Sequence, residues 1–158
     1  MTPTSEERVQ HALDVAYRFL GRRDRTVAEV RERLEADAIE AEVADEAIAE
    51  LTRQGYVDDA RYAHRFAEDR RTIDAWGAER IERRLLAVGV EPALIAAALG
   101  ERGAAEELEA AVAVLRRRFP RAPADDRDRD RALALLVRKG YDLDLAYDAV
   151  RAHERDAA

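Results

Sequence analysis

Cysteine is absent from the chain of 158 residues, and histidine occurs only three times. The lack of cysteine excludes disulfides, thiolate nucleophiles and cysteine-based zinc sites, and three histidines leave little material for a histidine metal site. No apolar run approaches the roughly 18 residues that span a membrane, and the first residues, MTPTSEERVQ, do not resemble a signal peptide. We therefore expect a cytoplasmic protein with no metal, no cofactor and no membrane contact.

Lysine is nearly absent as well, since Lys139 is the only lysine among 27 basic residues. Such a bias is typical of a GC-rich genome, and it also suits bidentate contacts with carboxylates or phosphates. Charged residues make up 39% of the chain, yet the net charge is only −7. Because both signs are interleaved, the composition indicates a solvated helical surface.

Three segments share one pattern at a constant spacing of 51 residues: EADAIEAEVADEAI (35–48), LAVGVEPALIAAAL (86–99) and VRKGYDLDLAYDAV (137–150). In this register Ala38 aligns with Gly89 and Gly140. The aligned apolar sets are Leu34, Leu85 and Leu136; Ile39, Val90 and Tyr141; Val43, Leu94 and Leu145; Ala47, Ala98 and Ala149; and Ile48, Leu99 and Val150. We interpret this as an internal repeat, which fixes the architecture.

Apolar residues recur at helical spacing almost throughout, and no alternating strand pattern appears. The pattern predicts an all-α fold with helices at about 5–20, 26–37, 41–54, 58–73, 77–88, 91–101, 104–119, 128–139 and 142–154. The repeat divides these nine helices into three tandem three-helix modules, 1–57, 58–102 and 103–158. Because modules of about 50 residues bury little surface alone, we expect them to pack into an elongated, curved array.

Helix ends are marked by short local signals. Thr4-x-x-Glu7 and Thr26-x-x-Glu29 have capping-box spacing, and Pro92 suits a first helical position. Gly55, Gly89 and Gly140 each follow an apolar-periodic run, as a left-handed C-terminal cap requires. The buried face of the helix at 58–73 is expected to comprise Tyr62, Phe66 and Ile73.

The adjacent acids Asp58 and Asp59 could form a metal-binding pair, but no third ligand stands at a suitable spacing, so we expect one of them to cap a helix. A hydrolase using these acids with His11, His64 or His153 has no supporting spacing either. We therefore expect no catalytic residue and a protein that is not an enzyme.

Basic residues gather at three places along the chain. Residues 61–84 contain seven arginines against five acids, whereas residues 1–60 contain eight basic and fifteen acidic side chains. Two further clusters lie near predicted helix C-termini, where the helix dipole alone can account for them. The candidates for partner binding are Arg22, Arg23, Arg25, Arg61, Arg70, Arg71, Trp76, Arg80, Arg83, Arg84, Arg116, Arg117 and Arg118.

Within the middle cluster, Arg80, Arg83 and Arg84 are expected to share one helical face. That face either contacts phosphates or an acidic protein surface, or is solvated and paired with Glu79 and Glu82. Trp76 either packs in the core or anchors a partner.

The motifs Gly55-Tyr56-x-Asp58-Asp59-x-Arg61-Tyr62-Ala63, Trp76-Gly77-x-x-x-Ile81-x-x-x-Leu85 and Leu136-x-x-x-Gly140-Tyr141 resemble those of the RecX family, regulators of the bacterial RecA recombinase. The resemblance extends from about residue 12 to 152. Its motif positions are Gly55, Tyr56, Asp58, Asp59, Tyr62, Phe66, Gly77, Ile81, Leu85, Gly89, Gly140 and Tyr141.

This resemblance implies an all-helical array of three three-helix modules that binds the RecA filament on single-stranded DNA. Such a protein lies along the filament groove and restrains ATPase activity, filament growth and strand exchange. We expect it to act as a monomer and to contact DNA only weakly.

The alternative is a stand-alone DNA-binding protein, since trihelical modules resemble helix-turn-helix units. Against it, residues 41–54 carry Arg53 as their only base beside Glu42, Asp45, Glu46 and Glu50.

Overall fold

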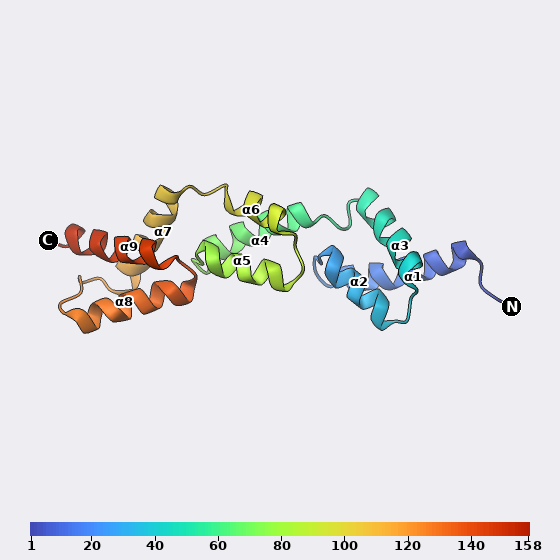
Figure 1. The fold of residues 1–158 in the computed structure, drawn as a ribbon, viewed down its shortest axis with the longest axis horizontal. Coiled ribbons are helices and arrows are strands. Elements are labelled where there is room, and N and C mark those ends of the chain that lie inside the picture. Colours follow the sequence, from blue (N-terminus) through green and yellow to red (C-terminus); the bar gives the residue numbers. More distant parts are fainter. The chain divides into compact units, whose positions relative to one another are not determined.

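The computed structural model describes residues 1–158, which form nine α-helices and no strand (Figure 1). The helices are α1 (Ser5–Leu20), α2 (Val27–Ala36), α3 (Ala41–Arg53), α4 (Asp59–Ile73), α5 (Ala78–Ala87), α6 (Pro92–Leu99), α7 (Ala104–Arg118), α8 (Asp126–Lys139) and α9 (Leu143–Asp156). The predicted all-α fold is therefore confirmed. No helix is long and apolar enough to cross a membrane.

The predicted capping signals start the first two helices. Thr4 and Thr26 each accept a hydrogen bond from the amide of the glutamate three residues later, and each glutamate side chain accepts the amide of its threonine, which completes the capping box. Pro92 is the first residue of α6, where its missing N–H leaves no helical bond unmade. These local choices fix where the helices begin.

The 51-residue repeat corresponds to three equivalent turns. In each, a residue with positive φ follows the second helix, at Ala38 (60°), Gly89 (82°) and Gly140 (97°). The next amide then donates to the carbonyl of the aligned leucine five residues earlier, with an N···O distance of 3.0 Å in all three turns. The leucines, Leu34, Leu85 and Leu136, are fully buried. The aligned sequence pattern thus encodes a Schellman-type helix end.

The helices group into two compact units, which are described separately. Residues 1–63 with 85–95 form the first unit, and residues 64–84 with 96–158 form the second. In the first unit, α1, α2 and α3 pack on one another around a core that includes Leu13, Val30, Leu34, Ile48 and Leu51. In the second, α7, α8 and α9 pack around a core that comprises Ala111, Val112, Leu115, Ala132, Leu136, Tyr141, Ala146, Ala149 and Val150.

Within the first unit, the N-terminus of α2 meets the turn after α5. The Thr26 hydroxyl donates to the carbonyl oxygen of Val88 at 2.6 Å, and the Val27 amide donates to the Asp59 carboxylate at 2.9 Å. The backbone of Gly89 approaches so closely that an added Cβ would lie 2.3 Å from the Cβ of Ala28. A carboxylate at the start of α4 therefore caps α2 at this junction.

The second unit repeats this junction one module later. The amides of Gly77 and Glu79 donate to the carbonyls of Lys139 and Gly140 at 2.8 and 2.9 Å. The Ala78 amide, at the start of α5, donates to the Glu107 carboxylate at 2.8 Å. In both units a carboxylate from a following helix caps the N-terminus of an earlier one, and a glycine turn abuts the same N-terminus.

One burial prediction is wrong. Ile73 was expected on the buried face of α4, but it is the last residue of that helix and is 69% exposed. The buried face instead includes the alanines Ala63 and Ala67, while Tyr62 and Phe66 are half-buried. Helix α4 has 15 residues and extends past the core that it covers. Its last residue, Ile73, therefore lies beyond the packed layer.

Candidate partner-binding surface

The first arginine cluster, directly after α1, is largely held by the fold. Arg23 forms an ion pair with Glu29 at 2.5 Å, which raises the pKa of the guanidinium. Arg25 lies 3.6 Å from the same carboxylate and stacks on the Phe19 ring at 4.0 Å. Arg22 is exposed and makes no such contact. Of this cluster, only Arg22 presents a charge that the fold does not use.

Three arginines of α4 also serve the structure. Arg61 donates to the carbonyl oxygen of Gly55 at 2.7 Å, and Arg71 donates to that of Leu99 at 3.0 Å. Burial, followed by the nearby charge of Arg102, lowers the pKa of Arg71. Arg70 forms an ion pair with Asp74. These side chains therefore link helix ends and loops within their own units.

Trp76 is half-buried, and its ring forms a platform for Arg80. The Arg80 guanidinium lies 4.1 Å from the ring centroid and donates to the carbonyl oxygen of Arg138 at 3.1 Å. The Phe66 ring meets the Trp76 ring edge-on, with 6.1 Å between the ring centroids. Arg83 and Arg84, by contrast, are exposed. Arg80 thus differs from Arg83 and Arg84, with which it was predicted to share one helical face, because its side chain stacks on Trp76 and donates a hydrogen bond within the second unit.

The third cluster ends α7. Arg116 forms an ion pair with Asp156, and Arg118 lies 5.6 Å from the Phe119 ring. Arg117 is exposed. As with Arg22 in the first cluster, one member of this cluster, Arg117, is exposed and has neither an ion pair nor a ring contact within the protein.

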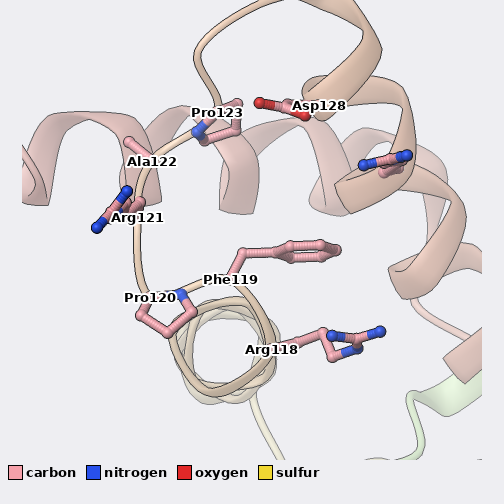
Figure 2. A pocket seen from close by; sticks show the side chains of 8 residues that line it. Arg118, Phe119, Pro120, Arg121, Ala122, Pro123 and Asp128 are labelled. Carbon is pink, nitrogen blue, oxygen red and sulfur yellow. The ribbon is translucent and has the colours of Figure 1, made fainter.

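The loop after α7 lines a pocket of about 320 Å³ that the sequence did not reveal. Figure 2 shows the Phe119 ring facing the Arg118 guanidinium, while Arg121 points away from the ring. The lining residues are Arg118, Phe119, Pro120, Arg121, Ala122, Pro123, Asp128 and Arg131. Pro120 and Pro123 belong to the loop, whereas Asp128 and Arg131 belong to α8, so the pocket forms only where the loop meets that helix.

The acidic pair has two separate structural roles. Asp58 caps its own helix by accepting the Arg61 amide at 3.0 Å, as predicted for one member of the pair. Asp59 accepts the Val27 amide instead, and burial raises the pKa of its carboxyl group. No group of three or more His, Cys, Asp and Glu side chains is placed to hold a metal ion.

The contacts of His153 and His64 do not involve Asp58 or Asp59. His153 is buried and its Nε2 lies 2.9 Å from the carbonyl oxygen of Phe119. The Nδ1 atom of His64 lies 3.2 Å from the Glu101 carboxylate. The contacts of these acids and histidines do not link a nucleophile to a base and an orienting group, which is what nucleophilic catalysis requires.

Two buried polar residues hold the junctions: Thr26, which the sequence marked only as the cap of its own helix, and Glu107, which it did not single out. Thr26 is fully buried, and its hydroxyl both caps α2 and bonds Val88. Glu107 is buried beside Arg102 at 3.0 Å while it caps α5. Their roles depend on a chain segment about 60 or 30 residues away, so local patterning shows only half of each contact.

Helix α3 has an acidic outer face. Glu42, Asp45 and Glu46 are exposed, and Arg53, its only base, pairs with Glu50. Such a face repels phosphates, and it does not suit a recognition helix in a DNA groove.

The sequence matches three RecX family models in succession. Residues 12–51 match the first RecX three-helix domain, residues 58–99 the second, and residues 105–150 the third. The regulatory protein RecX of Trichlorobacter lovleyi is 38% identical over 135 residues, which cover 82% of this chain and 87% of that protein. The regulatory protein RecX of Stenotrophomonas maltophilia is 35% identical over 150 residues, covering 94% and 88%.

A crystal structure of RecX from Lactobacillus salivarius has the same fold. It superposes with a TM-score of 0.84 at 18% identity, over 95% of this chain and 99% of that one. In chain order, the three domain matches fall on α1–α3, α4–α6 and α7–α9.

Proposed function

Because the chain belongs to the RecX family of regulatory proteins, we propose that it binds the filament formed by the RecA recombinase on single-stranded DNA and restrains its activity. In this proposal the protein is not an enzyme. It lies along the filament groove and limits ATPase activity, filament growth and strand exchange.

One observation carries the proposal: each of the three predicted modules leaves at least one exposed arginine that the fold does not use. Among the arginines that the sequence indicates, these are Arg22 in the first module, Arg83 and Arg84 in the second, and Arg117 in the third. A single exposed cation contributes less than about 1 kcal/mol to an ion pair. Several such contacts in one chain gain avidity when the target repeats at a matching spacing, as a filament does.

The proposed contact surface is therefore narrower than the thirteen residues that the sequence indicates. Arg23, Arg61, Arg71 and Arg80 have hydrogen-bond partners inside the protein, and their replacement would disturb the fold. Arg83 and Arg84 provide the cleanest pair for a test, because both are exposed on α5 and neither supports a junction.

The test is the ATPase rate of RecA on single-stranded DNA as the protein is titrated in. We expect the wild type to slow turnover. Arg83→Ala/Arg84→Ala should need about fivefold more protein for half-inhibition, since two exposed cations together contribute about 1 kcal/mol. Arg155→Ala, which removes an exposed arginine near the end of α9, is the matched control and should behave as wild type.

Two results would contradict the proposal. Turnover and filament length that do not change at excess protein would exclude regulation of the filament. Tight, salt-sensitive binding to duplex DNA without RecA would instead favour the stand-alone DNA-binding alternative.

A further inference from the structure

The second unit contains a groove of about 450 Å³ bounded by the end of α4, the outer side of α7 and the second half of α8. The apolar part of its lining consists of Ile73, Ala75, Ala110, Ala113, Val114 and Leu135. The three α7 residues are small or β-branched, so they leave depth for one inserted side chain. The groove thus offers an apolar seat on an otherwise highly charged protein.

The polar part of the lining is almost entirely basic. Four cations line the groove, Arg71, Arg117, Arg118 and Lys139, against one acid, Asp74. The Asp74 carboxylate is already paired with Arg70, which lies outside the lining. A local excess of three positive charges therefore lies on a chain whose net charge is −7. Such a local field attracts acidic groups.

Ile73 is the exposed apolar side chain of this groove. At 69% exposure it is the one large aliphatic side chain of the lining that is exposed, and it ends α4 directly beside the basic side chains. Arg117 is also exposed, and it has no carboxylate partner within the protein. A large apolar side chain next to free positive charge is typical of an anchor position at a protein interface.

We propose that this groove docks an acidic segment of a partner protein, with one aliphatic side chain of the segment packed against Ile73 and Val114. Carboxylates that flank the inserted side chain pair with Arg117 and Arg118, whereas Lys139 already donates to the carbonyl oxygen of Asp74 at 2.7 Å. The inference does not depend on regulation of RecA, because it concerns the chemistry of the segment and not the identity of the protein that carries it.

Charge complementarity alone would also suit a nucleic acid, but the lining argues for a peptide. No aromatic side chain lines the groove, so an unstacked base would find no ring to stack on. The apolar residues would lie against phosphates and sugars, which gain nothing from them. The pocket at Phe119 (Figure 2) has an aromatic ring beside arginines and is the better place for a base.

The test is fluorescence anisotropy with a labelled peptide in which aspartates and glutamates flank a pair of leucines. We expect saturable binding that weakens with added salt, since charge pairs at an exposed rim are screened. The same peptide with serines in place of the leucines should bind about tenfold more weakly, the loss typical of one anchoring side chain. An oligothymidine should not displace the peptide.

Substitutions of groove residues test whether the peptide binds there. Ile73→Ser should weaken binding by about tenfold, and Arg117→Ala by about threefold, since an exposed ion pair contributes little. Leu143→Ser and Arg155→Ala are the matched controls, because they remove an exposed leucine and an exposed arginine elsewhere in the second unit. Circular dichroism checks that all four variants are folded.

The proposal is overturned if Ile73→Ser and Arg117→Ala bind as the wild type does, or if no peptide binding is observed. It is also overturned if oligothymidine displaces the peptide, which would make the groove a nucleic-acid site. A concentration-dependent dimer that Ile73→Ser abolishes would assign the groove to a second copy of this chain, and would likewise overturn it.

Discussion

The turns at Ala38, Gly89 and Gly140 share their hydrogen bonds and a positive φ, but they differ in what lies beside them. A Cβ added at Gly89 would lie 2.3 Å from the Ala28 side chain, and one added at Gly140 would lie 2.2 to 2.9 Å from the Cβ, N and Cα atoms of Arg80. Ala38 already carries a Cβ and is exposed. The same turn is therefore free in one place and tightly packed in two.

The difference separates two reasons for glycine. A left-handed backbone favours glycine at all three turns, yet the first turn accepts alanine at a modest strain. At the other two, the N-terminus of an earlier helix touches the turn, and no side chain fits. Glycine at 89 and 140 thus marks the junctions inside each unit, whereas the residue at 38 reports only backbone conformation.

The largest expected effect is the loss of glycine at a packed turn. Gly140→Ala should lower the free energy of unfolding of the second unit by about 3 kcal/mol, because left-handed strain adds to overpacking against the Arg80 backbone. Urea unfolding followed by Trp76 fluorescence measures this change, since the only tryptophan lies in the second unit.

Gly89→Ala should cost less, about 2 kcal/mol, because its new Cβ meets only the side-chain methyl of Ala28. Ala28→Gly in the same chain removes that methyl and should restore part of the loss. Hydrogen exchange at α2 and α3 reports the stability of the first unit. Equal costs at both turns, with no rescue by Ala28→Gly, would show that strain alone and not packing sets the preference for glycine.

The residue that follows the turn also differs among the three modules. Tyr141 aligns with Ile39 and Val90, but only Tyr141 has a hydroxyl, which donates to the carbonyl oxygen of Ala75 at 2.9 Å. Ala75 has a φ of 54°, unusual for a residue with a side chain. Tyr141→Phe should keep the core filled and remove this bond, at a cost of about 1.5 kcal/mol in urea unfolding.

The pH dependence of the same variant tests the environment of the phenol. Burial, followed by the charge of Glu107, raises the pKa of Tyr141 from 10.0 to about 12. A raised folded-state pKa gives stability that is present below pH 10 and is lost as the pH rises towards 12. The advantage of wild type over Tyr141→Phe should therefore shrink across this range, and a constant difference would contradict the assignment.

The carboxylate cap of the first junction should contribute about 1 kcal/mol. Asp59→Ala removes the acceptor for the Val27 amide and should destabilise the first unit by that amount. Asp59→Asn keeps an acceptor oxygen without a buried charge, and it serves as the control at neutral pH.

The sign of the pH effect follows from the pKa of Asp59, which burial raises above its ordinary value of 3.8. Its contribution to stability is fully present below pH 3.8 and is lost as the pH rises through the folded-state pKa. Wild type should therefore lose stability relative to Asp59→Asn in that interval. If wild type gains relative to Asn there, the hydrogen bond outweighs desolvation.

Sequence patterning predicted the helices because each signal is local. The capping boxes at Thr4 and Thr26, the proline that opens α6 and the aligned leucines all act within a few residues, and the structure has them where predicted. Ile73 failed because helical periodicity shows which face is apolar but not how far the underlying core extends.

The candidate surface could be predicted less well, because a guanidinium is free or occupied according to distant groups. Arg71 reaches a carbonyl 28 residues away, and Arg80 reaches one 58 residues away. Composition places these arginines together with Arg83 and Arg117, but only the fold separates the occupied from the exposed. Their contact with RecA stays a prediction.

The smallest change in stability is expected at Ala38, the one turn residue of the three that already carries a Cβ. Ala38→Gly removes the strain of a φ of 60° but adds backbone freedom to the unfolded chain, so we expect a net stabilisation of about 0.5 kcal/mol. Ala36→Gly, two residues earlier at the end of α2, is the matched control and should destabilise by a similar amount, since that position is right-handed helix. Thermal and urea unfolding of both variants measure the difference. A gain at Ala38 beside large losses at the reverse substitutions, Gly89→Ala and Gly140→Ala, would establish that the three turns share one backbone and differ only in their neighbours.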